Sequence, residues 1–107
     1  MANSKLEHAA KLAEVGTQLA QQAREPDDAM LAWLADLEDG RRIVVYRMLF
    51  GNARICIGPA NSKTYDDGYC YAGTGNAIVA ACLWVAGGGE GEPEGWTKNL
   101  QTGETRL

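Results

Sequence analysis

The chain contains few of the side chains on which catalysis depends. It has one histidine, His8, and two serines, Ser4 and Ser62. A Ser–His–Asp or Cys–His relay needs a base within hydrogen-bond reach of its nucleophile, and no motif here places a nucleophile beside His8. The adjacent acids Asp66 and Asp67 do not suit a glycosidase pair, because neighbouring residues at the start of a strand usually point apart. We therefore expect no catalytic residues and no enzymatic activity.

Cysteine is scarce as well. Cys56, Cys70 and Cys82 are an odd number, and no two of them have the Cys-x-x-Cys spacing of metal and redox sites. The favoured interpretation is three small buried hydrophobes in a reducing compartment, and a Cys56–Cys70 bridge between paired strands is the alternative. A zinc site would need a fourth ligand from a distant helix, so we expect no metal and no cofactor.

Positive charge and long hydrophobic runs are both lacking. The 14 Asp and Glu outnumber the 10 Lys and Arg, which gives a net charge of −4. Nucleic-acid affinity comes mainly from cations that neutralise phosphates, so a nucleic-acid partner is disfavoured. The longest apolar run, residues 77–86, is about half of the ~20 residues that span a bilayer, and the N-terminus lacks a signal-peptide layout. We expect a cytoplasmic protein without membrane contact.

The first 40 residues are expected to be helical, within a single domain that covers residues 1–107. Residues 5–23 are rich in Ala, Leu, Gln, Glu and Lys, and their apolar side chains recur at spacings of three and four. Residues 26–38 predict a second helix, for which Pro26 suits the first turn. Its apolar residues recur with the same spacing: Met30, Trp33, Leu34 and Leu37.

From residue 41 the apolar residues alternate instead, as in strands. Residues 43–50 and 53–57 predict a hairpin with Gly51-Asn52 as its turn, and residues 69–72 predict a third strand. A helix over residues 76–86 follows. We expect an α+β fold with two N-terminal helices, a three-stranded antiparallel meander with one apolar helix packed on it, and a small C-terminal hairpin.

The predicted apolar helix needs more cover than one small sheet supplies, because it is apolar almost all round. The N-terminal helices or a second copy of the chain would provide that cover, so a homodimer is one expected arrangement. Residues 87–95 hold five Gly and three Glu. They predict a flexible acidic linker that joins the sheet and core helix of residues 41–86 to the C-terminal residues 96–107. Residues 96–107 predict the terminal hairpin.

The candidate partner contacts are four arginines and one tryptophan: Arg41, Arg42, Arg47, Arg54 and Trp96. If the odd-numbered residues of the first predicted strand face outward, Arg47 and Arg54 form a basic strip that suits an acidic protein partner. The alternative is that they are ordinary surface charges, which guard a sheet against edge pairing. Trp96 would also anchor the terminal hairpin against the body.

Four blocks of the sequence have a distinctive composition. They are Ile57-Gly58-Pro59, Tyr65-Asp66-Asp67-Gly68-Tyr69-Cys70-Tyr71, an Ala-rich helix that contains Trp84, and Gly89-Glu90-Gly91-Glu92-Pro93-Glu94-Gly95-Trp96 followed by Thr102-Gly103-Glu104-Thr105-Arg106. Over residues 41–106 the chain resembles a group of short phage and prophage proteins of unknown function. The resemblance implies a small intracellular viral product, and it implies no activity, cofactor or binding residue.

We therefore expect a non-enzymatic phage or prophage accessory protein that acts by protein–protein contact, with a host protein, a phage protein or itself. One alternative is an acidic anti-defence inhibitor that mimics nucleic acid with the six acids between residues 25 and 39. Another is a weak nucleic-acid-associated regulator that uses the arginines of residues 41–54.

Overall fold

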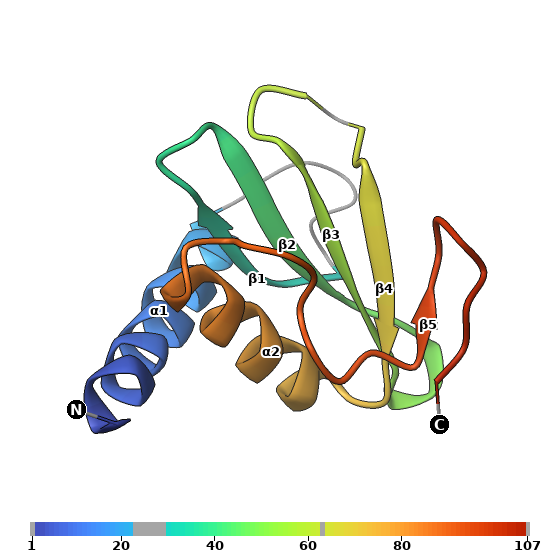
Figure 1. Cartoon of the computed structure of the whole chain (residues 1–107), viewed down its shortest axis with the longest axis horizontal. Coiled ribbons are helices and arrows are strands. Elements are labelled where there is room, and N and C mark those ends of the chain that lie inside the picture. The colour runs from blue at the N-terminus through green and yellow to red at the C-terminus, as the bar shows by residue number, and fades with distance from the viewer. Residues whose placement is uncertain (1, 23–29, 63, 107) are drawn as a thin grey trace.

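The structure, a computed structural model, describes residues 2–22, 30–62 and 64–106 (Figure 1). Its elements in chain order are α1 (Ala2–Gln22), β1 (Leu31–Asp36), β2 (Arg41–Arg47), the short 3₁₀ helix η2 (Leu49–Gly51), β3 (Ala53–Pro59), β4 (Asp67–Tyr71), α2 (Thr74–Ala86) and β5 (Lys98–Asn99). The strands form one antiparallel sheet in the order β1-β2-β3-β4-β5. The fold is therefore α+β.

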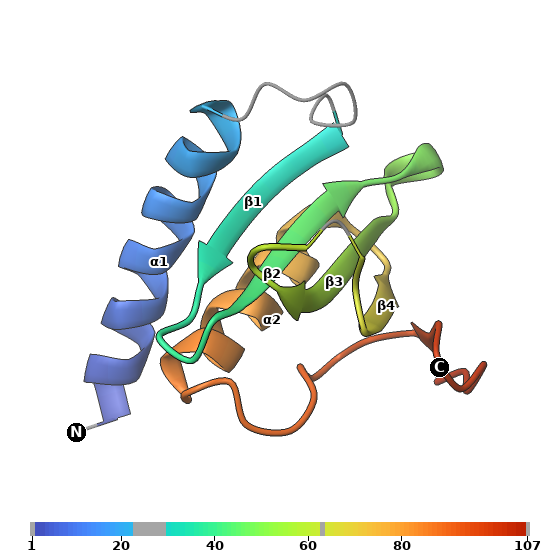
Figure 2. The same ribbon diagram turned by 90° about the horizontal axis from the view of Figure 1, so that it is seen from above.

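The two helices take different positions on this sheet. α2 packs across one face, whereas α1 lies along β1 at the edge of the sheet and also touches α2 (Figure 2). Gly16 allows a close approach of α1 to β1, because a Cβ there would collide with the indole of Trp33. That indole also donates a hydrogen bond of 2.9 Å from Nε1 to the carbonyl of Leu12.

Alternation along β2 and β3 places the centre of the core under α2. Ile43, Val45, Ile55 and Ile57 point to that face and are buried. α2 meets them with small side chains such as Ala77, which lets the helix approach the sheet closely.

The other face of the sheet carries a smaller apolar cluster. Val44 and Cys56 are buried there, with Leu34, Tyr46 and Tyr65 packed against them. Tyr65 comes from the β3–β4 connection, and its hydroxyl lies 3.1 Å from that of Tyr46. Side chains at the middle of β2 and β3 are thus covered on both faces.

The predicted second N-terminal helix is wrong where the structure describes it, and residues 26–29 lie outside the described residues. Leu31–Asp36 is an edge strand paired with β2. The helical spacing arose because β1 is covered on both faces: Trp33 lies in the cluster under α2, and Leu34 lies in the opposite one. A strand buried on both faces shows a continuous apolar run, and pairing in a sheet overrides the helix propensity of Ala and Leu.

The predicted three-stranded meander is also wrong, because the sheet has two further strands. β1 adds to one edge, and β5 pairs with β4 through Tyr69↔Asn99 and Cys70↔Lys98 at the other. The C-terminal segment still turns back on itself, with an isolated bridge between Lys98 and Thr105. β5 has two residues, which is too short for alternation to be visible in the sequence. The β2–β3 hairpin and helix α2 are present, but β2 covers Arg41–Arg47 and not the predicted residues 43–50.

Candidate binding surfaces

Two of the candidate arginines are paired with acids at the β1–β2 hairpin. Nη2 of Arg41 lies 2.7 Å from Asp39, and Nε of Arg42 lies 2.6 Å from Asp36. The hydrogen bond from the Arg41 side chain holds the pKa of Asp39 below its ordinary value, and the bond to Asp36 raises the pKa of Arg42. Their charges are therefore satisfied locally, which leaves little for an outside phosphate.

Arg47 and Arg54 do not form the predicted basic strip. Arg47 lies opposite Ala53 in the register of β2 and β3, whereas Arg54 lies opposite Tyr46, so the two arginines point to opposite faces. The odd-numbered face of β2, expected to be the outer one, is the buried face under α2. Lys63, a further cation of this part of the sequence, lies outside the described residues.

Trp96 is an anchor and not a surface contact. Its side chain is 2% exposed and packs on Tyr69, with ring centroids 5.8 Å apart. The guanidinium of Arg106 lies 3.8 Å from the centre of the Trp96 ring and covers it. A partner reaches this tryptophan only if the C-terminal segment moves away.

The hairpin tip, defined as Met48, Leu49 and Phe50, is the most exposed apolar part of the described chain. Leu49 is 73% and Phe50 is 96% exposed. The backbone of the tip is closed by hydrogen bonds from Met48 N to Asn52 O, 2.8 Å, and from Asn52 N to Leu49 O, 3.3 Å. The aromatic ring therefore projects from an ordered turn.

Phe50 adopts a backbone conformation that phenylalanine rarely takes. Its φ is 61° and its ψ is 32°, and Gly51 follows with a φ of 76°. Two left-handed residues in succession form a type I′ turn, whose first position normally holds Asn, Asp or Gly. The predicted turn at Gly51-Asn52 is thus displaced by one residue, because Phe50 and Gly51 occupy its centre.

A shallow hollow of about 450 Å³ lies at the base of the hairpin tip. Small side chains of β3 and β4, including Ala53 and Cys70, line it together with the two cations Arg54 and Lys98. Neither cation has an ion-pair partner in the part of the chain that the structure describes. Nε of Arg54 is buried there without a hydrogen-bond partner. The surroundings of the tip are therefore basic.

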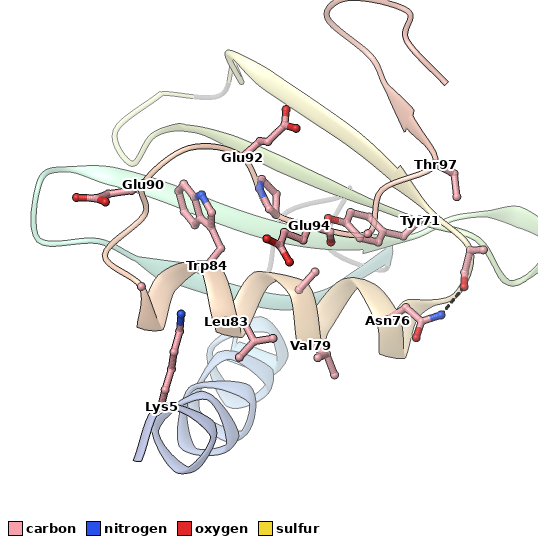
Figure 3. A pocket seen from close by; sticks show the side chains of 15 residues that line it. Lys5, Tyr71, Asn76, Val79, Leu83, Trp84, Glu90, Glu92, Glu94 and Thr97 are labelled. Carbon is pink, nitrogen blue, oxygen red and sulfur yellow. Dashed lines mark hydrogen bonds between the residues drawn. The ribbon is translucent and has the colours of Figure 1, made fainter. Parts of the chain in front are cut away.

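A larger groove of about 730 Å³ runs between α2 and the segment that follows it (Figure 3). We call it the α2 groove. α2 contributes apolar side chains to it, of which Val79 is 59% exposed. The rings of Tyr71 and Trp84 also line it, and Lys5 of α1 reaches the end near Gly87. Its rim carries three carboxylates: Glu90, Glu92 and Glu94.

Specific contacts hold the rim of the α2 groove in place, although a flexible linker was predicted for residues 87–95. Nε1 of Trp84 donates to the carbonyl of Gly91 at 3.0 Å, and the hydroxyl of Tyr71 donates to the carbonyl of Glu94 at 2.9 Å. Pro93, which lies between Gly91 and Glu94 in the sequence, is fully buried. The glutamates of this segment are therefore presented from an ordered backbone.

The charges on the rim of the α2 groove are mostly uncompensated. Glu92 lies 3.2 Å from Nη2 of Arg106. Glu90 and Glu94 have no ion pair among the described residues, and Glu94 lies between Trp84 and Tyr71 above α2 (Figure 3). The groove thus combines an apolar floor with unpaired carboxylates at its rim and the cation of Lys5 at its Gly87 end.

Cys56 and Cys82 are buried thiols whose surroundings disfavour the thiolate. All three are free thiols, so the alternative of a Cys56–Cys70 bridge is not seen. Burial raises the pKa of Cys56 and of Cys82 to about 11, and a thiol that stays protonated is a poor nucleophile. Over residues 2–22, 30–62 and 64–106, no three His, Cys, Asp or Glu side chains group closely enough to hold a metal ion.

The hairpin tip and the α2 groove were missed in the sequence for different reasons. The apolar run Met48-Leu49-Phe50 continues up to a turn signal, where polar residues are usual, and this was a usable sign of an exposed apolar tip. The groove depends on contacts of Trp84 and Tyr71 with a distant segment, and no local pattern indicates them.

Comparison of the chain with protein-family models, with curated proteins and with solved structures found no match. The resemblance to short phage proteins therefore stays a prediction. None of the described helices is both long and apolar enough to cross a membrane.

Proposed function

We propose that the chain is a non-catalytic accessory protein that acts by protein–protein contact through the hairpin tip. Such a role agrees with the resemblance to small phage and prophage products. The single observation that supports it is the exposed, left-handed Phe50.

The hairpin tip is energetically unfavourable within the chain itself. A bulky residue in the left-handed region costs about 1–3 kcal/mol, and this cost usually persists where the surroundings or a function require it. Phe50 gains no burial in return, because its ring is almost fully exposed. A partner that covers the ring would recover about 1.5–3 kcal/mol of hydrophobic free energy. Contact with a partner therefore explains both the strain and the exposure.

The charges around the hairpin tip indicate what kind of surface it meets. Arg54 and Lys98 lie beside it without ion pairs among the described residues. Aromatic anchors at the centre of an interface with charges at its rim are typical of protein contacts. We propose an apolar surface with negative charge at its edge as the binding partner of the tip.

The two nucleic-acid alternatives have less support among the described residues than contact through the hairpin tip. The arginines expected to bind phosphate are paired with acids or point to opposite faces. Of the six acids expected to mimic nucleic acid, Glu25, Asp27 and Asp28 lie outside the described residues, and Asp36 and Asp39 are paired with arginines.

The test is affinity capture from an extract of the source organism with three baits: wild type, Phe50→Asn and Val15→Ser. Val15 is 52% exposed on α1 and lines neither surface, so its variant is a matched control for the loss of an exposed apolar side chain. We expect proteins, including untagged copies of the chain, that wild type and Val15→Ser retain and Phe50→Asn loses. If all three baits retain the same proteins while Phe50→Asn is folded, contact through the hairpin tip is refuted.

A further inference from the structure

We propose that Cys70 is a modification site at which a small anionic disulfide attaches to the chain, held by Arg54 and Lys98 on either side of the thiol. The inference goes beyond the proposed function, because it depends neither on contact through the hairpin tip nor on a protein partner. Three observations support it: the accessibility of the thiol, the two cations that flank it, and a buried donor without a partner at the same place.

Cys70 is the most accessible thiol of the chain. Cys56 and Cys82 are buried, whereas Cys70 is half-buried, and all three are free. Cys70 also lines the hollow of about 450 Å³ at the base of the hairpin tip. Small-molecule sites commonly have volumes of about 300–1,000 Å³, so the hollow has room for a small reagent beside the thiol.

The strand register places a cation on each side of Cys70. In the β3–β4 pair Cys70 lies opposite Arg54, and in the β4–β5 pair it lies opposite Lys98. Directly opposed residues of antiparallel strands share a face, and their Cβ atoms lie about 4.5–5.5 Å apart. This face is the one opposite α2, since Tyr69, the neighbour of Cys70, lies in the cluster under that helix. The thiol is therefore the centre of a row of cation, thiol and cation.

Neither cation is neutralised within the part of the chain that the structure describes. The ion pairs found there involve neither Arg54 nor Lys98. Nε of Arg54 is also buried without a hydrogen-bond partner. Buried donors nearly always have an acceptor, and a carboxylate is the acceptor that a guanidinium binds most strongly. The site therefore favours a molecule that carries carboxylates.

The reaction at this site is thiol–disulfide exchange. Cys70 loses its proton to solvent, and its sulfur attacks one sulfur of the disulfide. The S–S bond of the reagent breaks, and a new S–S bond joins Cys70 to one half of it. The other half leaves as a thiolate and takes up a proton, so Cys70 is oxidised and half of the reagent is reduced. The two cations raise the local concentration of a disulfide that bears carboxylates, and oxidised glutathione is a disulfide of this class.

A second thiol on the same face does not reach Cys70. Cys56 lies opposite Gly68, so it is diagonal to Cys70 on the adjacent strand. Diagonal neighbours lie about 7–8 Å apart, whereas a disulfide needs Cβ atoms about 3.5–4.5 Å apart. Burial also raises the pKa of Cys56 to about 11, which keeps that thiol protonated. The mixed disulfide on Cys70 therefore persists until an external thiol removes it.

The first experiment compares two methanethiosulfonates that share a reacting group and differ in charge, one with a sulfonate and one with a trimethylammonium. Each rate with the folded chain is divided by the rate with β-mercaptoethanol, which removes the intrinsic difference between the reagents. We expect wild type to prefer the anionic reagent by about tenfold or more, and this preference should fall by about threefold or more in Arg54→Gln and in Lys98→Gln. Cys70→Ser should lose the fast reaction with both reagents.

Two controls separate the local cations from net charge and from folding. Lys11→Gln removes an exposed cation of α1 that does not line the hollow, so it should keep the wild-type preference. Arg54→Lys keeps the positive charge and should keep most of the preference that Arg54→Gln loses. Lys98 is exposed, so Lys98→Gln tests the site even where Arg54→Gln does not fold. Equal normalised rates in wild type, or a preference in Lys98→Gln as large as in Lys11→Gln, overturns the proposal.

The second experiment uses oxidised glutathione itself. The folded chain is incubated with it at mildly alkaline pH, and the modified cysteines are identified by mass spectrometry of peptides. We expect an adduct on Cys70 that dithiothreitol removes and that forms about threefold or more slowly in Lys98→Gln than in Lys11→Gln. A Cys56–Cys70 disulfide in place of the adduct, a first adduct on Cys56 or Cys82, or equal rates in the two variants refutes the site.

Discussion

The strained turn at Phe50 allows a direct test of the physical argument. Replacement of Phe50 by Gly removes a steric conflict of Cβ in the left-handed region, which should stabilise the fold by roughly 1–2 kcal/mol. The greater conformational freedom of Gly in the unfolded chain offsets about 0.4–1 kcal/mol of this gain. The 96% exposed ring contributes almost no burial that could be lost. We expect Phe50→Gly to raise the free energy of unfolding of the monomer by about 0.5–1 kcal/mol.

Two further variants separate backbone strain from loss of the ring. Phe50→Asn keeps a side chain that tolerates the left-handed region, so it should stabilise the monomer by about 1 kcal/mol. Phe50→Ala removes the ring but keeps a Cβ, so its stability should stay within about 0.5 kcal/mol of wild type. Urea unfolding at several protein concentrations, followed by tryptophan fluorescence, measures all four chains and separates folding from association.

The result that would refute this reasoning is a loss of stability in Phe50→Gly. A decrease of about 1 kcal/mol or more would mean that the ring makes contacts within its own chain. The case for a functional tip would then disappear, because the strain would already be compensated inside the fold.

Three other predictions follow from the packing and the cysteines. Gly16→Ala should destabilise the fold by about 1–3 kcal/mol in urea unfolding, because its Cβ collides with the indole of β1. Trp84→Ala should lose about 3–5 kcal/mol, because it removes a buried indole and its bond to the 87–95 segment; a loss below about 1 kcal/mol would contradict its burial. Burial raises the pKa of Cys56 and of Cys82 from an ordinary 9.0 to about 11. The free energy of unfolding should therefore be highest below pH 9, where the thiols are protonated in both states, and should fall as the pH rises from 9 toward 11. Because Cys56 and Cys82 are buried and Cys70 is only half-buried, alkylation of the folded chain at pH 8 should modify Cys70 first, as mass spectrometry of peptides would show.

The sequence was informative where residue type and turn signals agree with the element that forms. β2 and β3 are covered on both faces, like β1, but they could be predicted because both are rich in β-branched residues and a Gly-Asn turn signal separates them. α2 could be predicted because it is a long uninterrupted run of helix-compatible residues. In both cases the local pattern agrees with the tertiary environment.

The sequence was misleading where tertiary contacts decide the outcome. Trp33 and Leu34 are buried on opposite sides of β1, and adjacent buried residues fit a helical spacing as well as a strand. Arg47 and Arg54 seemed to belong together by proximity in sequence, whereas the register of the hairpin separates them onto opposite faces. Register cannot be read from residue type alone, and it decides which charges share a surface.

The candidate surfaces show why net charge is a poor guide to the partners of this chain. The net charge of −4 suggests an evenly acidic surface, but the charges divide into those that are paired and those that are free. Asp36 and Asp39 neutralise the arginines at one end of β2, so those four side chains contribute little to the field around the protein. The charges outside these two pairs include the carboxylates at the rim of the α2 groove and the cations Arg54 and Lys98 near the hairpin tip. The register places these cations on the sheet face opposite α2, so a partner that meets them and a partner that meets the groove approach from different sides. Salt should weaken contacts made through either group, because it screens exposed charges beyond about 8–10 Å.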